Sequence, residues 1–172
     1  GSVDVPLGFT FPFYGAGRTS VRVSMNGFLS FAAAGNGITN TALPSASDPD
    51  AVIAPFWADL FPPAAGATVH TLAEAGRFTV QYTNVPTWNE RTSGLGHTFQ
   101  VILLASGEVR FQYLTMNGET ASASVGIEDD AGAVGLQAAF NEAYVADNLA
   151  VRFHPGIEWV TASNTTGSLA PG

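Results

Sequence analysis

The chain has 172 residues, a formal net charge of −8, and six basic residues that are all arginine. This acidic balance excludes the positive surface that nucleic-acid binding requires, and it disfavours binding to an anionic membrane surface for the same reason. The absence of cysteine excludes disulfides and thiolate metal ligands. No apolar run reaches the length of about 18 residues that a membrane-spanning helix needs, and the chain length suits one domain with a sizeable core.

The first expected elements are strands near the N-terminus. Phe9, Phe11 and Phe13 are spaced two residues apart, so they share one face of a strand that we expect to lie on the core. Pro12 has no N–H to donate, which favours the edge of a sheet. Two alternating runs follow between residues 20 and 31, and Asn26-Gly27 joins them. Because both of these residues tolerate positive φ, we expect a type I′ hairpin turn.

A long polar segment follows, in which residues 32–50 show no periodicity. A loop of this length is uncommon inside a compact domain and is often functional or mobile. It ends with Asp48 and Asp50 on either side of a proline, and two such carboxylates can direct oxygens at one calcium ion. The same residues suit an ordinary turn, because Asp before Pro initiates turns. Without the full Asp-x-Asp-x-Asp-Gly pattern of a calcium loop, we prefer the turn.

Residues 51–60 form an almost wholly apolar run. Such a run has to be covered on both faces, so it predicts a central strand of the core. Pro55 cannot donate to a ladder, which predicts a bulge or a strand end at that position. Trp57 lies in the middle of the run, and we expect it to be buried.

Two hairpins are expected between residues 67 and 116. The first pairs residues 68–71 with residues 78–82, and the second pairs residues 99–104 with residues 108–113. Apolar and polar residues alternate in these strands, which predicts one buried face and one face in water.

The segment between the two hairpins, residues 86–96, holds a candidate ligand site made of Trp88, Asn89, Glu90 and Arg91. Sugars bind to an apolar platform with planar hydrogen-bonding groups beside it, and these four residues supply both. The same residues could instead make a loop cap, in which the indole folds back onto the sandwich and the charged pair is only solvated. Of the two interpretations we prefer the cap.

The last strands are expected at residues 124–127 and 135–140, paired across the acidic turn Glu128, Asp129 and Asp130. This turn is a second candidate calcium site, because three adjacent carboxylates repel one another unless they are solvated or bridged by a cation. A closing strand is expected at residues 149–153. The whole pattern predicts an all-β fold, an antiparallel β-sandwich built from consecutive hairpins, with long loops and little or no helix.

Four sequence blocks resemble the nidogen-like extracellular domain. They are VSMNGFLSF (residues 23–31), VIAPFWADL (52–60), FTVQYTNVP (78–86), and HTFQVILL (97–104) followed by GEVRFQY (107–113). The resemblance implies a non-catalytic, β-rich module of secreted or surface proteins, in animals and in large bacterial proteins. It carries over no catalytic or ligand residues.

The resemblance places the nidogen-like domain at residues 1–155 and leaves residues 156–172 as a linker or the start of a following module. That tail begins near Trp159 and continues with a Gly-x-Leu-x-Pro-Gly pattern, which resembles the opening of the immunoglobulin-like modules of bacterial surface proteins.

Residue patterns for enzyme chemistry are missing from the sequence. The three histidines, His70, His97 and His154, lie in different expected elements, where we expect ordinary surface positions. The absence of lysine excludes Lys–Asn isopeptide crosslinks. We therefore expect a non-catalytic extracellular adhesion or structural module that binds a protein partner or neighbouring modules of its own chain. The alternative is a carbohydrate-binding module that uses the Trp88 loop. Calcium is the one cofactor that the sequence suggests.

Overall fold

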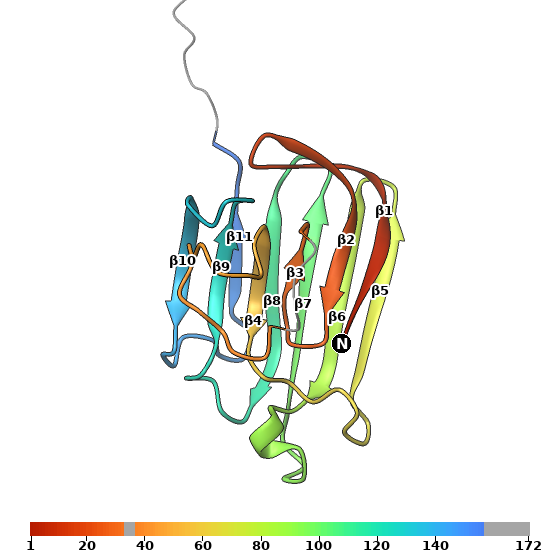
Figure 1. Cartoon of the computed structure of the whole chain (residues 1–172). Coiled ribbons are helices and arrows are strands. Elements are labelled where there is room, and N and C mark those ends of the chain that lie inside the picture. Colours follow the sequence, from red (N-terminus) through yellow and green to blue (C-terminus); the bar gives the residue numbers. More distant parts are fainter. Residues whose placement is uncertain (33–36, 157–172) are drawn as a thin grey trace, which may run out of the picture.

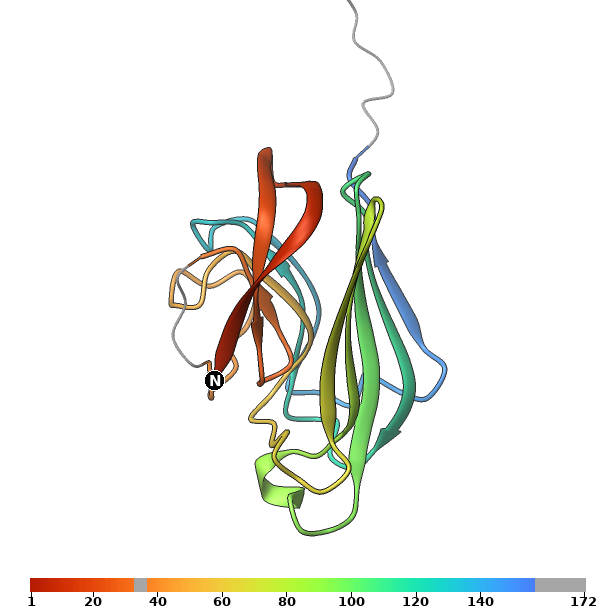
Figure 2. The ribbon, with the colours of Figure 1, turned by 90° about the vertical axis from the view of Figure 1, so that its right-hand side faces the viewer.

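The computed structural model describes residues 1–32 and 37–156. Two antiparallel sheets face each other as a sandwich, as Figure 1 and Figure 2 show, so the predicted fold class is confirmed. The single helical element in this part of the chain is the 3-10 turn η1 (Trp88–Glu90). No helix among the described residues is therefore long enough to cross a membrane.

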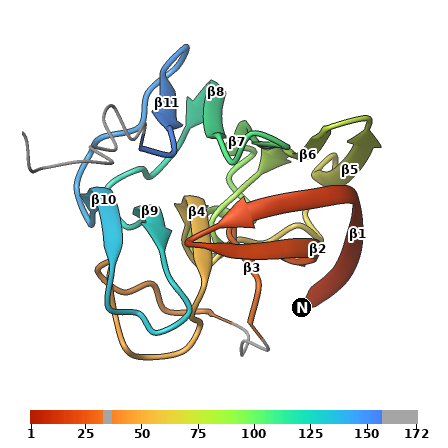
Figure 3. The ribbon, with the colours of Figure 1, turned by 90° about the horizontal axis from the view of Figure 1, so that it is seen from above.

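The two sheets are seen from above in Figure 3. The six-stranded sheet has the order β1 (Ser2–Phe13), β2 (Ala16–Ser24), β3 (Leu29–Ser30), β4 (Val52–Trp57), β9 (Ser124–Glu128) and β10 (Gly135–Phe140). The five-stranded sheet has the order β11 (Ala150–Phe153), β8 (Val109–Asn117), β7 (Gly96–Leu104), β6 (Arg77–Val85) and β5 (Thr68–Glu74). The predicted hairpins β5–β6, β7–β8 and β9–β10 are all present.

The closing strand β11 pairs with β8, so the chain crosses from the six-stranded to the five-stranded sheet after β10. In Figure 1, β1 begins toward the lower end of the sandwich, and the chain leaves the upper end after β11. Residues 157–172, including Trp159, lie outside the described residues. The predicted boundary between residues 155 and 156 therefore stays a prediction.

The hairpin between β2 and β3 differs from its predicted turn type. Ser24 N–H donates to the Phe28 oxygen at 3.0 Å, which closes a three-residue loop. Gly27 has φ +75°, whereas Asn26 is not among the residues with positive φ, so the type I′ turn was wrong. A three-residue hairpin loop needs a left-handed residue at one position only, and glycine supplies it. A Cβ on Gly27 would also lie only 2.0 Å from the Phe56 oxygen.

The main core fills the space between the sheets. The inward residues of β6, Phe78, Val80 and Tyr82, are fully buried, as the alternation predicted. The rings of Tyr82 and Phe99 stack with their centroids 4.7 Å apart. Aromatic pairs of this kind contribute about 0.5–1.5 kcal/mol beyond the area they bury.

Two buried hydroxyls join the sheets across this core. The Tyr82 O–H donates to the Ser24 oxygen, and the Tyr113 O–H donates to the Pro55 oxygen, both at 2.6 Å. The register between β4 and β9 shifts between Ala54 and Trp57, so the bulge predicted at Pro55 is confirmed. The tyrosine of β8 therefore supplies a partner for the Pro55 carbonyl at the irregular point of the β4 ladder.

The long loop covers a second, smaller core on the outer face of the six-stranded sheet. Leu43 packs there with Phe28, Val52, Ala54 and Trp57. The indole N–H of Trp57 donates to the Gly37 oxygen at 2.7 Å, and the indole is fully buried. The predictions of a doubly covered central strand and of a buried Trp57 are confirmed. The described part of the loop, residues 37–50, serves as a structural cover for the strand.

Candidate functional site

The four residues predicted as a ligand site lie around η1, below the sandwich in Figure 1. The Trp88 side chain is 45% exposed and packs edge-on against Phe61 with centroids 5.1 Å apart. The guanidinium of Arg91 lies 4.4 Å from the centre of the indole, and its Nη1 donates to the Trp88 oxygen at 2.6 Å. Arg91 and Phe61 therefore cover part of the indole, and what remains exposed is the part that a ligand could contact.

Glu90 is engaged inside the protein. Its Oε2 accepts from the Thr87 hydroxyl at 2.8 Å, and its Oε1 accepts from the Glu119 N–H at 2.8 Å. The carboxylate thereby ties η1 to the loop between β8 and β9. His97 lies beside it, with Nε2 3.8 Å from Glu90 Oε2.

His97 departs from the expected surface position, because its side chain is fully buried. Neither of its ring nitrogens has a hydrogen-bond partner among the described residues. Burial lowers the pKa of His97, against the opposing effect of Glu90 and Glu119, and so favours the neutral imidazole. Its ring packs 4.8 Å from Phe56. Sequence reasoning missed this burial because His97 lies near the start of its strand, where a histidine is expected to be open to solvent.

Trp88 and Asn89 line a depression of about 520 Å³, which we call the Trp88 groove. Asn40, Asp59 and Glu119 also line it, so hydrogen-bonding groups surround the indole. Glu90 lines the groove as well, but its carboxylate is bonded to Thr87 and Glu119, so Trp88 and Asn89 are the predicted residues that offer the groove side chains not engaged in this way. The geometry is compatible with both the sugar site and the loop cap, and the choice between them stays a prediction.

The two predicted calcium segments lie together in the fold, although 78 residues separate Asp50 from Glu128 in sequence. The Ala51 N–H donates to the Asp129 oxygen at 3.0 Å, which joins the loop to the end of β9. Burial raises the pKa of Asp50, and repulsion by Asp48, Asp129 and Asp130 raises it further. We call these five acids, including Glu128, the acidic corner.

Within the acidic corner, Glu128 is not part of the turn where the sequence placed it. It ends β9 and is fully buried. Its Oε2 accepts from the Ser45 N–H at 2.8 Å, while Oε1 has no partner among the described residues. Burial raises the pKa of Glu128 to about 7, and the Asp50 and Asp129 charges add to that rise. The buried strand β9 continues one residue further than the acidic run suggested.

The other acids of the corner have separate partners. Asp129 Oδ1 accepts from the Ala133 and Val134 N–H groups, which lowers the pKa of Asp129 and fixes the turn. Asp130 forms an ion pair with Arg18. Within residues 1–32 and 37–156, no group of three or more histidine or acidic side chains is placed to hold a metal ion. Calcium binding at the acidic corner stays a prediction.

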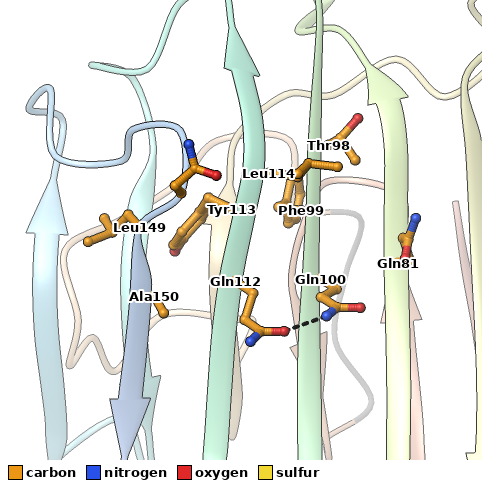
Figure 4. A pocket seen from close by; sticks show the side chains of 10 residues that line it. Gln81, Thr98, Phe99, Gln100, Gln112, Tyr113, Leu114, Leu149 and Ala150 are labelled. Atoms are coloured by element: carbon orange, nitrogen blue, oxygen red, sulfur yellow. Dashed lines mark hydrogen bonds between the residues drawn. The ribbon is translucent and has the colours of Figure 1, made fainter.

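A row of glutamines that the sequence did not single out crosses the outer face of the five-stranded sheet. Gln81 of β6 lies opposite Gln100 of β7, which lies opposite Gln112 of β8. Figure 4 shows the three amides side by side, with Gln100 donating to Gln112. We call these three residues the amide row. No sequence motif marks them, because only the strand register brings them together.

An apolar depression of about 360 Å³ lies where the described chain ends, and we call it the exit cleft. Phe13 and Tyr14 line it from the β1–β2 hairpin, Leu136 from β10, and Phe153 from β11. Gly156, the last described residue, lines the same cleft. Leu136 is 59% exposed there, which is unusual for a large aliphatic side chain in a packed domain.

Two antiparallel sheets with a buried aromatic core, extensive loops and no helix beyond η1 among the described residues define a β-sandwich module. A model of the family described as NIDO related matches residues 2–159, so the chain belongs to the NIDO-related family. Domains of this family are typically extracellular. No solved structure matched the chain. The bacterial setting implied by the sequence resemblance stays a prediction.

Proposed function

We propose that this chain is a non-catalytic adhesion or structural module of a larger secreted or surface protein, and that it binds a protein partner or the neighbouring domains of its own chain. The observation that carries the proposal is the exit cleft. It combines exposed apolar side chains with the point at which the chain continues past Gly156. A contiguous apolar patch that stays exposed on a domain marks an interaction site more often than a polar part of the surface does.

The composition of the exit cleft suits a packed contact between modules. Tyr14 is 40% exposed and Leu136 is 59% exposed, and Phe153 adds a second aromatic ring to the lining. Aromatic and large aliphatic side chains dominate the buried centres of protein interfaces, and charged groups are depleted there. A module joined directly after residue 156 would stand beside this surface at high effective concentration.

The test compares the unfolding midpoint of this chain with that of the same chain joined to its following module. We expect the junction to raise the midpoint of this domain. Leu136→Asp should abolish that rise, because it places a charge in the cleft. The matched control is Val3→Asp, since Val3 is exposed to a similar extent on β1, away from the cleft. An unchanged midpoint on joining the two modules would count against the proposal.

A second candidate function, carbohydrate binding, is favoured by the half-exposed indole in the Trp88 groove. Trp88→Ala should abolish binding in a glycan screen while leaving the melting temperature nearly unchanged. If instead the substitution costs several kcal/mol of stability and no glycan binds, Trp88 belongs to a loop cap.

A further inference from the structure

Two adjoining hollows on the outer face of the five-stranded sheet form one continuous trough. The hollow over β7, β8 and β11, shown in Figure 4, has a volume of about 340 Å³. The hollow over β5 and β6 has a volume of about 420 Å³. Gln81 and Gln100 line both, so the trough passes from one hollow to the other across the amide row.

The amide row crosses the strands in strict register. His70 of β5 lies opposite Gln81, and Ala150 of β11 lies opposite Gln112, so the row extends from one edge strand to the other. Neighbouring strands are spaced about 4.8 Å apart. From β5 to β8 the trough therefore offers a planar hydrogen-bonding group at each strand spacing, in a line perpendicular to the strands, and the line ends at Ala150 of β11.

The amides keep hydrogen-bonding capacity that the protein does not use. Gln100 Nε2 donates to Gln112 Oε1, and Gln81 Nε2 donates to the Thr83 hydroxyl. Among the described residues, the oxygens of Gln81 and Gln100 and the Nε2 of Gln112 have no partner. Each side-chain amide has two donors and two acceptor lone pairs, so acceptors and donors both face the trough.

Exposed aliphatic side chains flank the amide row on both sides. Leu114 lies two residues along β8 from Gln112 and is 64% exposed. Leu72 lies two residues along β5 from His70 and is 57% exposed. Leu114 is the extra residue of a β-bulge, because Thr98 pairs with Thr115 while Phe99 pairs with Tyr113. Bulges interrupt the alternation of side chains, and here Leu114 and Thr115 are consecutive exposed residues, of which Leu114 lines the hollow of Figure 4.

The charge of the trough favours an uncharged ligand. The charged side chains that line it, within the described residues, are Glu74 and Arg77, which pair with each other at 3.8 Å at the β5 end. The other side chains that line the trough carry amide, hydroxyl, aliphatic or aromatic groups, with the imidazole of His70, although the chain as a whole carries a charge of −8.

We propose that this trough binds a neutral, linear oligosaccharide laid across the strands. Hydroxyl groups both donate and accept, as the amide row requires, and the C–H faces of sugar rings would pack on the two leucines. In a β-linked chain, each sugar advances by close to one strand spacing, so successive sugars meet successive amides. This function goes beyond the contact with neighbouring modules and does not use the exit cleft.

An extended peptide fits the row less well. Its side chains on one face repeat every two residues, about 6.6 Å apart, which does not match the strand spacing of about 4.8 Å. The backbone groups beneath the trough are also already paired within the sheet, so a peptide laid across the strands gains no ladder bonds.

The experiment titrates the full chain with cellohexaose, xylohexaose and mannohexaose, and measures binding by calorimetry. Gln100→Ala and Gln112→Ala should each weaken binding about five- to ten-fold, because each removes planar hydrogen bonds to the sugar. Gln100→Glu, which keeps the size and adds a charge, should weaken it as well and covers the case in which Gln100→Ala does not fold. Thr115→Ala is the matched control, since Thr115 lies on β8 outside both hollows.

Three outcomes would overturn the proposal. The first is that none of the three oligosaccharides binds. The second is that a sugar binds but the amide variants bind as well as the wild type while Trp88→Ala does not, which would move the site to the Trp88 groove. The third is read from a parallel titration with a sulfated hexasaccharide, and it is that this charged glycan binds in the trough in preference to the neutral chains. The unfolding midpoint of the joined modules tests the exit cleft alone, and the titrations test the trough alone. Failure of one proposal can therefore be told apart from failure of the other.

Discussion

The buried hydroxyl of Tyr113 offers a direct measure of how the two sheets are joined. Tyr113→Phe removes a 2.6 Å hydrogen bond and leaves the Pro55 carbonyl buried without that partner. An unpaired buried polar group costs about 1–3 kcal/mol. The register shift beside Pro55 leaves the neighbouring ladder irregular, so we take the middle of that range, about 2 kcal/mol.

For a domain of this size, a loss of about 2 kcal/mol lowers the melting temperature by about 4–8 °C. The assay is thermal and urea unfolding of the wild type and the variant, with the urea slope m unchanged. Tyr144→Phe is the control. Because Tyr144 is 38% exposed, removing its hydroxyl should leave the free energy of unfolding almost unchanged. If Tyr113→Phe melts like the wild type, the hydroxyl does not stabilise the bulge and the reasoning is refuted.

Three further predictions test other parts of the fold. The pKa of Glu128 is about 7 in the fold, against 4.5 as its ordinary value, so the folded protein holds the proton of this carboxyl more tightly than the unfolded chain does. The stability that this difference provides is complete below about pH 4.5 and is lost as the pH rises through about 7. Glu128→Gln should therefore be more stable than the wild type by about 2–3 kcal/mol at pH 8, and a stability difference between the two that stays constant from pH 4 to 8 would contradict this. Trp57→Ala should cost about 3–5 kcal/mol in chemical denaturation, because it empties the second core, and a cost below about 1 kcal/mol would show that the loop cover collapses freely. Millimolar calcium should raise the melting temperature over a chelator control if the acidic corner binds the ion, and an unchanged value removes that prediction.

Much of the fold was predictable because alternation is local. The hairpins formed by residues 68–82 and 99–113 follow from side chains two residues apart, and a strand places such residues on one face wherever it lies in the sheet. The same reasoning located the bulge at Pro55, since the missing N–H is a property of that residue alone.

The surfaces depend on information that a local pattern does not contain. Gln100 and Gln112 meet because β7 and β8 pair in one register, and a shift of one residue between the two strands would place the two amides on opposite faces of the sheet. Glu128 is buried because Ser45 of the distant loop supplies its hydrogen-bond donor. The turn type at Asn26 and Gly27 depends on how closely β4 approaches Gly27. The preferences of two-residue turns carry no information about such a distant strand.

The placement of the first and last strands determines how the domain would carry a pulling force. β1 and β11 are edge strands of different sheets, and the chain enters toward the lower end and leaves at the upper end (Figure 1). A tension applied along the strands therefore loads the β1–β2 and β11–β8 ladders in shear, with many hydrogen bonds stretched together instead of one after another. The force passes from one sheet to the other through the packed aromatic core, so mechanical failure requires either a loaded ladder to shear or the two sheets to slide apart.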